Sequence, residues 1–368
     1  MRFFLPGLSA LLAVSLATSV HAGVRSLGIV GPANEQTIAY DVNAAGQVAA
    51  VLENDAGRQR GVLFDQGKLI EIGSLGGDFS DARAINPSGV VVGSAQAADG
   101  HWRAFLYTRA MGMRELGTLG GPSSYGLALD DAANVAGFAD TASGDFHAFH
   151  YTRGGAMKDL GTLGGKISYA SGMNNVGQVV GTAATASEFR HAFLYDPVRG
   201  MVDLGTLGGR QSSATAVNDR GVVVGASETK DRRWHAFVHD GSKMVDLGAL
   251  IGFGSSFATD INSAGHVVGT VVRGEERLSF VWRDNTMTVH RGGKGLHLTH
   301  AITDKEIVVG ATYSKRLDAA TMSAAAPAVV TRGGSELLTL IAAMLLAALA
   351  GVAYSMRFGY LSRRSYRA

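Results

Sequence analysis

One seven-residue motif recurs along the chain at a fixed interval. Asp-Leu-Gly-Thr-Leu-Gly-Gly occupies positions 159–165 and 203–209, and near copies occupy 71–77, 115–121 and 246–252. The last glycine of the first four copies advances by 44 residues each time. A fixed interval of about 20 to 50 residues is typical of repeat architectures, in which each unit packs on its neighbours. The motif therefore constrains the fold before it says anything about function.

Each unit contains four short apolar runs separated by Gly, Asn, Asp or Pro, which predicts four strands joined by turns. The third run, such as His191–Tyr195, is largely apolar on both alternating faces, which indicates a strand buried on both sides. The second run ends in a small residue that sets the register of seven units: Ala50, Gly93, Gly137, Gly181, Gly225, Gly269 and Gly310.

Seven sheets that bury one another face to face predict an all-β fold, a seven-bladed β-propeller of four-stranded repeats of about 44 residues. The stretch Val24–Gly31 matches the fourth run of a unit but has no unit before it. We expect this strand to complete the last unit and close the ring, which removes exposed sheet edges. In that last unit we expect a long polar loop, Thr312–Ala325, and a third strand near Ala328–Gly334 that carries Pro327.

The turn before the second run also repeats. Asn at its first position can accept hydrogen bonds from the backbone ahead, and Gly at its fourth position supplies positive φ, so these residues are expected to close hairpins. A calcium loop is disfavoured because alternating oxygen ligands and a final bidentate Glu are missing. Five units share this form: Asn43–Gly46, Asn86–Gly89, Asn174–Gly177, Asn218–Gly221 and Asn262–Gly265.

The two ends of the chain carry membrane-targeting patterns. Arg2, the apolar run Phe3–Val20 and the small residues before position 23 predict a signal peptide over 1–22, cut between Ala22 and Gly23. An uncut signal anchor is the alternative. The repeats would then fill residues 23–334.

Near the C-terminus, Leu337–Met356 has 20 residues without a charge, about 30 Å of helix, which matches the hydrocarbon core of a membrane. A transmembrane helix over 335–356 and a basic cytoplasmic tail over 357–368 place the repeats on the periplasmic or extracellular side, because basic residues stay in the cytoplasm. A buried core helix is the alternative. The membrane, reached through this one helix, is therefore an expected partner.

Composition excludes several classes of function. The chain of 368 residues has no cysteine, so it has no disulfide or thiol chemistry. A formal net charge of +2 with scattered Lys and Arg argues against nucleic-acid binding. Phosphate loops, nucleophile elbows and zinc-protease motifs are absent from the sequence. We therefore predict no catalytic residue, cofactor or metal, and a monomer.

Repeated basic and acidic residues are better explained by architecture than by chemistry. His147, His191 and His235 occupy equivalent positions, and a metal ring would need their nitrogens about 2.0 to 2.1 Å from one ion, which separate sheets disfavour. A glycosidase needs two unlike acids in one cleft, whereas these acids repeat. We expect Arg60, Arg103 and the three histidines to pair with the acids that begin the motif: Glu71, Glu115, Asp159, Asp203 and Asp246.

His-Ala-Phe at 147–149, 191–193 and 235–237, together with Asp-Leu-Gly-Thr-Leu-Gly-Gly, resembles the bacterial HAF repeat. The resemblance covers about residues 24–334 and implies an extracellular repeat protein without an assigned activity. The unit is also similar to kelch propellers, although the kelch Trp is missing. Gly333 and Gly334, followed by the apolar helix and an Arg pair, resemble a C-terminal sorting signal that a rhomboid-like protease cuts; retention of the anchor is the other interpretation.

Two functional hypotheses remain. The first is a non-enzymatic, surface-exposed envelope protein that binds a glycan or an envelope protein or serves structurally, with unit-specific loops as candidate contacts. The second is a glycan-acting hydrolase or lyase on a propeller scaffold, which would require unlike carboxylates, His or Tyr clustered at one end of the central channel. The candidate loops are Ala95–His101, Ser227–Arg233 and Lys315–Ala324.

Overall fold

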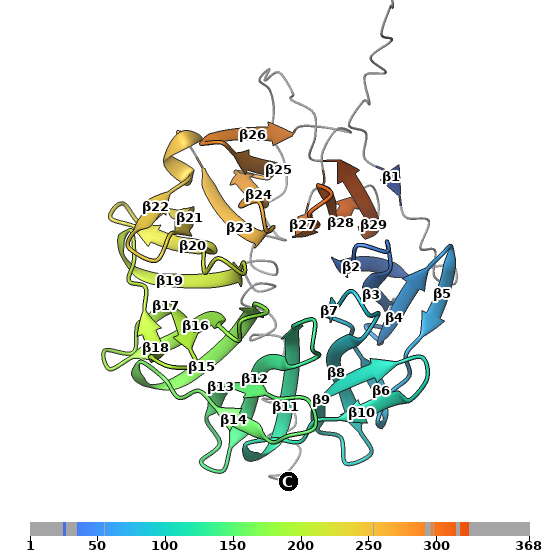
Figure 1. Ribbon diagram of the computed structural model, residues 1–368. Helices are drawn as coiled ribbons and strands as arrows, with labels where there is room; N and C mark the ends of the chain where they lie inside the picture. Colours follow the sequence, from blue (N-terminus) through green and yellow to red (C-terminus); the bar gives the residue numbers. More distant parts are fainter. Residues whose placement is uncertain are drawn as a thin grey trace, which may run out of the picture.

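The computed structural model describes residues 25–26, 35–54, 56–252, 254–290, 296, 298–313 and 317–323. Within them the chain forms a β-propeller whose seven sheets follow one another around a ring (Figure 1). Six sheets consist of consecutive strands, and a seventh joins strands from the two ends of this part of the chain. We number them sheet 1 (β2–β5), sheet 2 (β6–β10), sheet 3 (β11–β14), sheet 4 (β15–β18), sheet 5 (β19–β22), sheet 6 (β23–β26) and sheet 7 (β1 and β27–β29).

The strands run antiparallel within each sheet, from an innermost first strand to an outermost fourth strand (Figure 1). The first strands are β2 Gln36–Val42, β6 Gly76–Ser80 with β7 Ala84–Ile85, β11 Gly120–Leu129, β15 Gly164–Met173, β19 Gly208–Val217, β23 Ser255–Ile261 and β27 Leu298–Ile302. The second strands are β3 Val48–Glu53, β8 Val91–Ala97, β12 Val135–Thr141, β16 Val179–Thr185, β20 Val223–Thr229, β24 Val267–Arg273 and β28 Ile307–Tyr313.

The outer half of each sheet is shorter. The third strands are β4 Gln59–Asp65, β9 Trp102–Thr108, β13 Phe146–Tyr151, β17 Arg190–Asp196, β21 Trp234–His239, β25 Glu276–Arg283 and β29 Leu317–Ser323. The fourth strands are β5 Lys68–Glu71, β10 Gly112–Glu115, β14 Met157–Asp159, β18 Gly200–Asp203, β22 Met244–Asp246, β26 Thr286–His290 and β1 Arg25–Ser26. The one helix in the described residues is the 3₁₀ turn η1, Gly248–Leu250.

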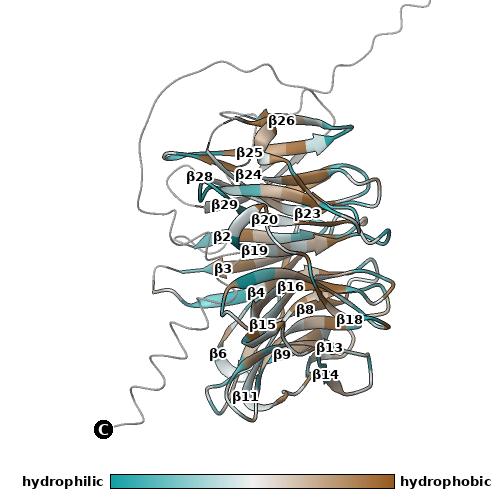
Figure 2. Cartoon of the chain, turned by 90° about the vertical axis from the view of Figure 1, so that its left-hand side faces the viewer, coloured by the Kyte–Doolittle hydropathy of each residue, from teal (hydrophilic) through white to brown (hydrophobic). Residues whose placement is uncertain are grey.

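In sheets 2 to 6 the second-strand glycine allows the sheet to pack around a third-strand phenylalanine. A Cβ on Gly137 would lie 1.9 Å from the carbonyl oxygen of Tyr125 and 3.0 Å from the ring of Phe149, so no side chain fits there. The third-strand phenylalanine fills the space instead, and it is fully buried in five sheets, as Phe105, Phe149, Phe193, Phe237 and Phe280. Hydrophobic residues lie along the strands and many connecting turns are hydrophilic (Figure 2).

Neighbouring sheets are joined by buried polar contacts that repeat with the sequence. The Asn174 side-chain amide donates to the carbonyl of Asn218 in the next sheet at 2.9 Å, while its oxygen accepts the backbone N–H of Gln178. Ser168 accepts the backbone N–H of Ala148 in the preceding sheet at 2.8 Å. These residues are buried, so each contact satisfies polar groups that water cannot reach. The prediction that the repeated asparagines are turn residues is confirmed.

Sheet 7 confirms one prediction and corrects another. Arg25 of β1 pairs with Thr321 of β29, so the N-terminal strand completes the sheet made by the last repeat, as predicted. The third strand, however, is Leu317–Ser323 and not the stretch near Ala328. The reason is a short β28–β29 hairpin that sets Ala320 opposite Gly310, where sheets 2 to 6 place Phe. Most of the expected long loop and of the candidate binding loop Lys315–Ala324 is therefore strand, in β28 and β29.

The repeated motif also has a different place from the predicted one. It was expected to form the fourth strand and the turn after it. Its acid does end the fourth strand, but its final glycines already start the first strand of the next sheet, as Gly164 does in β15. Asp159 accepts the N–H of Gly161, and Thr162 donates to the carbonyl of Gly165, so the intervening residues are a hydrogen-bonded crossing between sheets.

The membrane-related predictions lie outside the described residues. These are the signal peptide with its cut at Ala22 and Gly23, the helix over 335–356, the basic tail and the processing site at Gly333 and Gly334. No helix long and apolar enough to span a membrane occurs in the part of the chain that the structure describes.

Candidate functional site

The innermost strands carry a β-bulge close to the turn that ends them. A bulge adds one residue to the strand and redirects its side chain. In sheet 2 the same place, between β6 and β7, holds Arg83. The bulged residues of the other six sheets are Tyr40, Leu127, Ser171, Thr215, Thr259 and His300.

Three of these side chains contact one another across sheets 7, 1 and 2. The rings of Tyr40 and His300 meet edge to face, with centroids 5.1 Å apart. The guanidinium carbon of Arg83 lies 4.4 Å from the Tyr40 ring centroid, within the range of a cation–π contact. Arg83 Nε also donates to Asp81 Oδ2 at 3.0 Å. We call Tyr40, Arg83 and His300 the ring-centre triad; it departs from the repeat.

Two aspartates follow bulged residues in sheets 1 and 6. Asp41 accepts the N–H of Ile85 in the next sheet at 2.8 Å, and burial raises the pKa of its carboxyl to about 6 although this bond and the Val42 N–H lower it. Asp260 accepts the N–H of Ile302 at 2.8 Å. Burial, opposed by that bond and assisted by the charge of Asp41, raises the pKa of Asp260 to about 7.

His300 is the least satisfied member of the triad. Its Nε2 is buried and has no hydrogen-bond partner. Burial, with a smaller contribution from the positive charge of Arg83, lowers the pKa of His300 to about 4. The imidazole is therefore neutral at physiological pH, and an unmet buried nitrogen of this kind costs about 1 to 3 kcal/mol. A bound polar group could supply the missing hydrogen bond.

The arrangement suits the binding of a small polar ligand better than the binding of a metal ion. Within the described ranges no group of three His, Cys, Asp or Glu side chains could hold a metal ion. The triad combines a cation, an aromatic face and a neutral imidazole, and two carboxylates that change charge near neutral pH lie on the innermost strands of sheets 1 and 6. A small polar ligand that both donates and accepts hydrogen bonds suits such a set.

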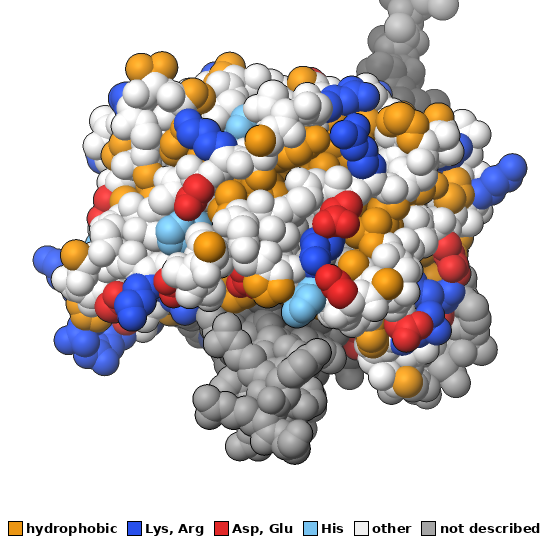
Figure 3. Space-filling model, turned by 90° about the horizontal axis from the view of Figure 1, so that it is seen from below, with side chains coloured by type: hydrophobic (Ala, Val, Ile, Leu, Met, Phe, Trp, Pro, Cys, Tyr) orange, Lys and Arg blue, Asp and Glu red, His pale blue; other side chains and the backbone are white. Residues whose placement is uncertain are grey.

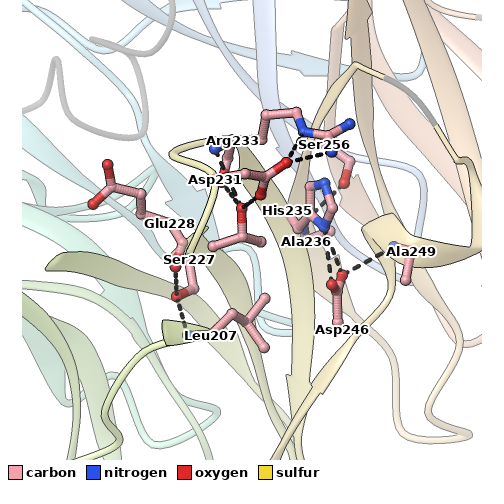
Figure 4. A network of polar contacts seen from close by, with 11 residues as sticks. Leu207, Ser227, Glu228, Asp231, Arg233, His235, Ala236, Asp246, Ala249 and Ser256 are labelled. Carbon is pink, nitrogen blue, oxygen red and sulfur yellow. Dashed lines mark hydrogen bonds and ion pairs between the residues drawn. The ribbon is translucent and has the colours of Figure 1, made fainter. Parts of the chain in front are cut away.

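The predicted outer pairs all form, and each joins the third strand to the fourth strand of its own sheet. His235 Nδ1 lies 2.9 Å from Asp246, whose carboxylate also accepts the N–H of Ala249 (Figure 4). On the rim seen from below, acidic side chains lie beside basic and histidine side chains (Figure 3). The other pairs are Arg60–Glu71, Arg103–Glu115 at 3.1 Å, His147–Asp159 at 2.8 Å and His191–Asp203 at 2.8 Å.

The two remaining candidate loops do not single out particular sheets. Residues 97–101 and 229–233 are hairpin turns with the same backbone hydrogen bonds as 141–145 and 185–189. In the second turn, Thr229 and Arg233 bind the carboxylate of Asp231, so its polar atoms serve the turn itself (Figure 4). The backbone of these two loops is therefore common to several sheets, and their role as ligand contacts stays a prediction that rests on their side chains.

The ring-centre triad was missed from the sequence, although a signal existed. The bulged residue stands three positions before the turn residue Asn43, Asn86 or Thr303, and comparing that column across units reveals the departure. The irregular loops and the repeated motifs lie elsewhere in each unit and do not include this column. The column from unit one to unit seven reads Tyr40, Arg83, Leu127, Ser171, Thr215, Thr259 and His300.

Comparison with known proteins shows the fold alone. No family model matches the chain, and no curated protein does. Among solved structures, the β-propeller domain of the trilobed protease from Pyrococcus furiosus, described as having an open velcro topology, is similar with a TM-score of 0.53 and 12% identity over 78% of this chain and 96% of that one. Puromycin hydrolase is similar with a TM-score of 0.54 and 12% identity. The match covers 78% of this chain and 51% of that one, so it spans about half of the hydrolase.

Proposed function

We propose that this protein is a non-enzymatic binding protein of the cell envelope, and that its ligand site is the ring-centre triad. The observation that carries the proposal is that Tyr40, Arg83 and His300 differ from the repeat at one structural position in three adjacent sheets. When the residue type at a repeated position changes in only one part of the ring, that part has a requirement that the other sheets do not share. The ligand would be a small polar molecule or the polar end of an envelope glycan or protein.

The alternative, a glycan-acting hydrolase or lyase, draws support from the raised pKa values of Asp41 and Asp260, since a general acid works best with a pKa near the operating pH. A binding function is favoured over a hydrolase or lyase because both oxygens of each carboxylate already accept hydrogen bonds from backbone N–H groups. Asp41 holds Val42 and Ile85, and Asp260 holds Ile261 and Ile302. Such contacts fix the sheets to one another and suit a structural role.

The setting of this site is also part of the proposal. We propose that the seven sheets act as the seven blades of one ring that β1 closes, that the chain belongs with HAF-repeat proteins, and that it is exported as a monomer. A C-terminal helix over 335–356 would hold it in the membrane with the repeats outside the cytoplasm. Pairing of β1 with β29 supports the closed ring, and the apolar run of 20 residues supports the anchor.

Glycan-array binding and calorimetry with the full-length protein in detergent test the ring-centre site. Tyr40→Ala and Arg83→Ala should each lower affinity by about tenfold or more, because each removes an aromatic or charged contact. Thr215→Ala, at the equivalent bulge of sheet 5, is the matched control and should leave binding unchanged. Turnover of a bound glycan that disappears in Asp41→Asn or Asp260→Asn would replace this proposal with the hydrolase.

A further inference from the structure

A second group of side chains, separate from the ring-centre triad, lies between sheets 2, 3 and 4. We call Trp102, Tyr125, Phe138, Phe146 and Tyr169 the aromatic cluster. Trp102 and Tyr125 stack with centroids 6.1 Å apart, and Tyr125 stacks on Phe138 at 4.7 Å. Tyr169 meets Phe138 edge to face at 5.1 Å and lies 6.1 Å from Phe146. The rings thus form one continuous row across three sheets.

Part of this row is accessible. Phe138 is fully buried, whereas Trp102, Tyr125 and Phe146 are partly exposed. The three rings therefore present apolar surface to solvent above a buried base. Partly exposed aromatic rings beside polar groups are a common lining of small-molecule sites.

The cluster contains one buried polar atom without a partner. Tyr169 is 3% exposed, and its hydroxyl makes no hydrogen bond. Burial raises the pKa of this phenol to about 12, with Arg190 lowering it and Asp140 raising it, so the hydroxyl stays protonated and can donate. A buried hydroxyl left unpaired costs about 1 to 3 kcal/mol, which a ligand oxygen could recover.

The charges around the hydroxyl narrow the class of ligand. Charges of both signs act on the cluster, because Asp140 and Arg190 act on Tyr169 and the carboxylates of Asp140 and Asp81 act on Tyr125. An uncharged ligand is therefore favoured over an anion or a cation. Hydroxyl groups that both donate and accept could use the carboxylate, the guanidinium and the phenol together.

From these observations we infer that the aromatic cluster binds one ring of a neutral sugar. The C–H face of a pyranose would pack on the exposed parts of Trp102, Tyr125 and Phe146, and a sugar hydroxyl would accept the hydrogen bond of Tyr169. The site shares no residue with the ring-centre triad, so the sugar site and the ring-centre site can be tested independently. The corresponding stack elsewhere, Trp234 on Phe257 at 6.4 Å, has Leu298 at the position of Tyr169 in the next sheet.

The test uses the full-length protein in detergent and three probes: methyl glucopyranoside, methyl galactopyranoside and N-acetylglucosamine. Ligand-detected NMR and tryptophan fluorescence measure binding. We expect at least one sugar to bind, and Tyr169→Phe to weaken it by about tenfold, because that change keeps the ring and removes only the hydroxyl. Trp102→Leu should weaken it further, whereas Trp234→Leu is the matched control and should have no effect.

The variants distinguish loss of sugar binding at the aromatic cluster from loss of folding and from binding at the ring centre. Tyr169→Phe preserves packing, so it remains informative even where Trp102→Leu fails to fold. Absence of binding for all three sugars, or binding that Tyr169→Phe leaves unchanged, overturns the inference; in the second case water satisfies the hydroxyl. Tyr40→Ala should leave this binding intact, and a loss there would assign the sugar to the ring centre instead.

Discussion

The innermost strands of sheets 3 to 5 and those of sheets 7, 1 and 2 share one backbone position, the bulge, and carry different side chains there. In the first arc the bulged residues are Leu127, Ser171 and Thr215, and the Thr215 hydroxyl donates to the backbone carbonyls of Val224 and Ala258. In the second arc the same position carries Tyr40, Arg83 and His300 in mutual contact. The comparison teaches that the repeated residues maintain the architecture, whereas the proposed ligand site uses residues that depart from the repeat at the shared bulge.

The largest expected effect comes from a residue that both arcs need for packing. Gly137→Ala in sheet 3 should lower the free energy of unfolding by about 3 kcal/mol, because its Cβ would lie 1.9 Å from a carbonyl oxygen. Sheet 1 already carries Ala50 at this place, opposite Val62 in place of Phe. Ala50→Gly should therefore cost only about 0.5 to 1 kcal/mol. Chemical denaturation of both variants compares the arcs directly, and equal losses would contradict the packing argument.

A smaller effect should depend on pH and should belong to the carboxylates next to the bulges. The folded pKa of Asp260, about 7, exceeds its ordinary value of 3.8, so its contribution to stability is complete below pH 3.8 and is lost as pH rises through about 7. Wild type should therefore lose roughly 2 kcal/mol relative to Asp260→Asn between about pH 4.5 and about pH 8, after allowance for partial exposure.

The same pH series needs a difference measurement, because His300 acts in the opposite direction. Its folded pKa of about 4 lies below the ordinary 6.5, so its contribution is lost as pH falls. When the free energy of unfolding of Asp260→Asn is subtracted from that of the wild type at each pH, the contribution of His300 cancels. A flat difference would show that Asp260 titrates as an ordinary exposed carboxyl.

An effect of about 1 kcal/mol is expected at the turns that lack glycine. Ala133 in sheet 3 and Glu306 in sheet 7 have φ of 62° and 60°, where five other turns place Gly. Ala133→Gly should raise the free energy of unfolding by about 1 kcal/mol by relieving left-handed strain. Glu306→Gly should give no gain, because it removes the contact of Glu306 with His266 at 2.9 Å. Thermal unfolding separates the two, and equal gains would refute the distinction.

The smallest effect should come from the outer pairs. His191→Gln removes an exposed contact with Asp203 at 2.8 Å, and surface pairs of this kind contribute about 0 to 1 kcal/mol. We expect a loss of about 0.5 kcal/mol, reduced further by salt. Denaturation at low and high ionic strength measures it. A loss as large as that of Gly137→Ala would mean that the outer pairs, and not the inner strands, hold the sheets.

The sequence predicted those parts of the molecule in which chemistry repeats. The 44-residue interval, the second-strand glycines and the basic residues opposite each acid all come from residues that recur in register, so each unit supports the interpretation of the next. The N-terminal strand was predicted for the same reason, because Val24–Gly31 is a recognisable copy of a repeated run. Pairing of β1 with β29 follows from it.

The parts that could not be predicted depend on single residues. Strand β29 was missed because Ala320 replaces the large aromatic residue that identifies a third strand elsewhere. The ring-centre triad was missed because Tyr40 and His300 are remote in sequence and become neighbours only through the ring. The hydroxyl of Tyr169 was missed because its lack of a partner is a property of packing, which no residue pattern encodes.

The pairing of β1 with β29 has a consequence for the order in which the molecule assembles. Arg25 and Thr321 are about 300 residues apart in the chain, and six sheets built from local contacts can form before the two meet. Local contacts form quickly, whereas contacts across such a distance come late in folding. During synthesis the N-terminal segment would therefore wait, unpaired, until almost the whole repeat region had emerged, which makes sheet 7 the last to form.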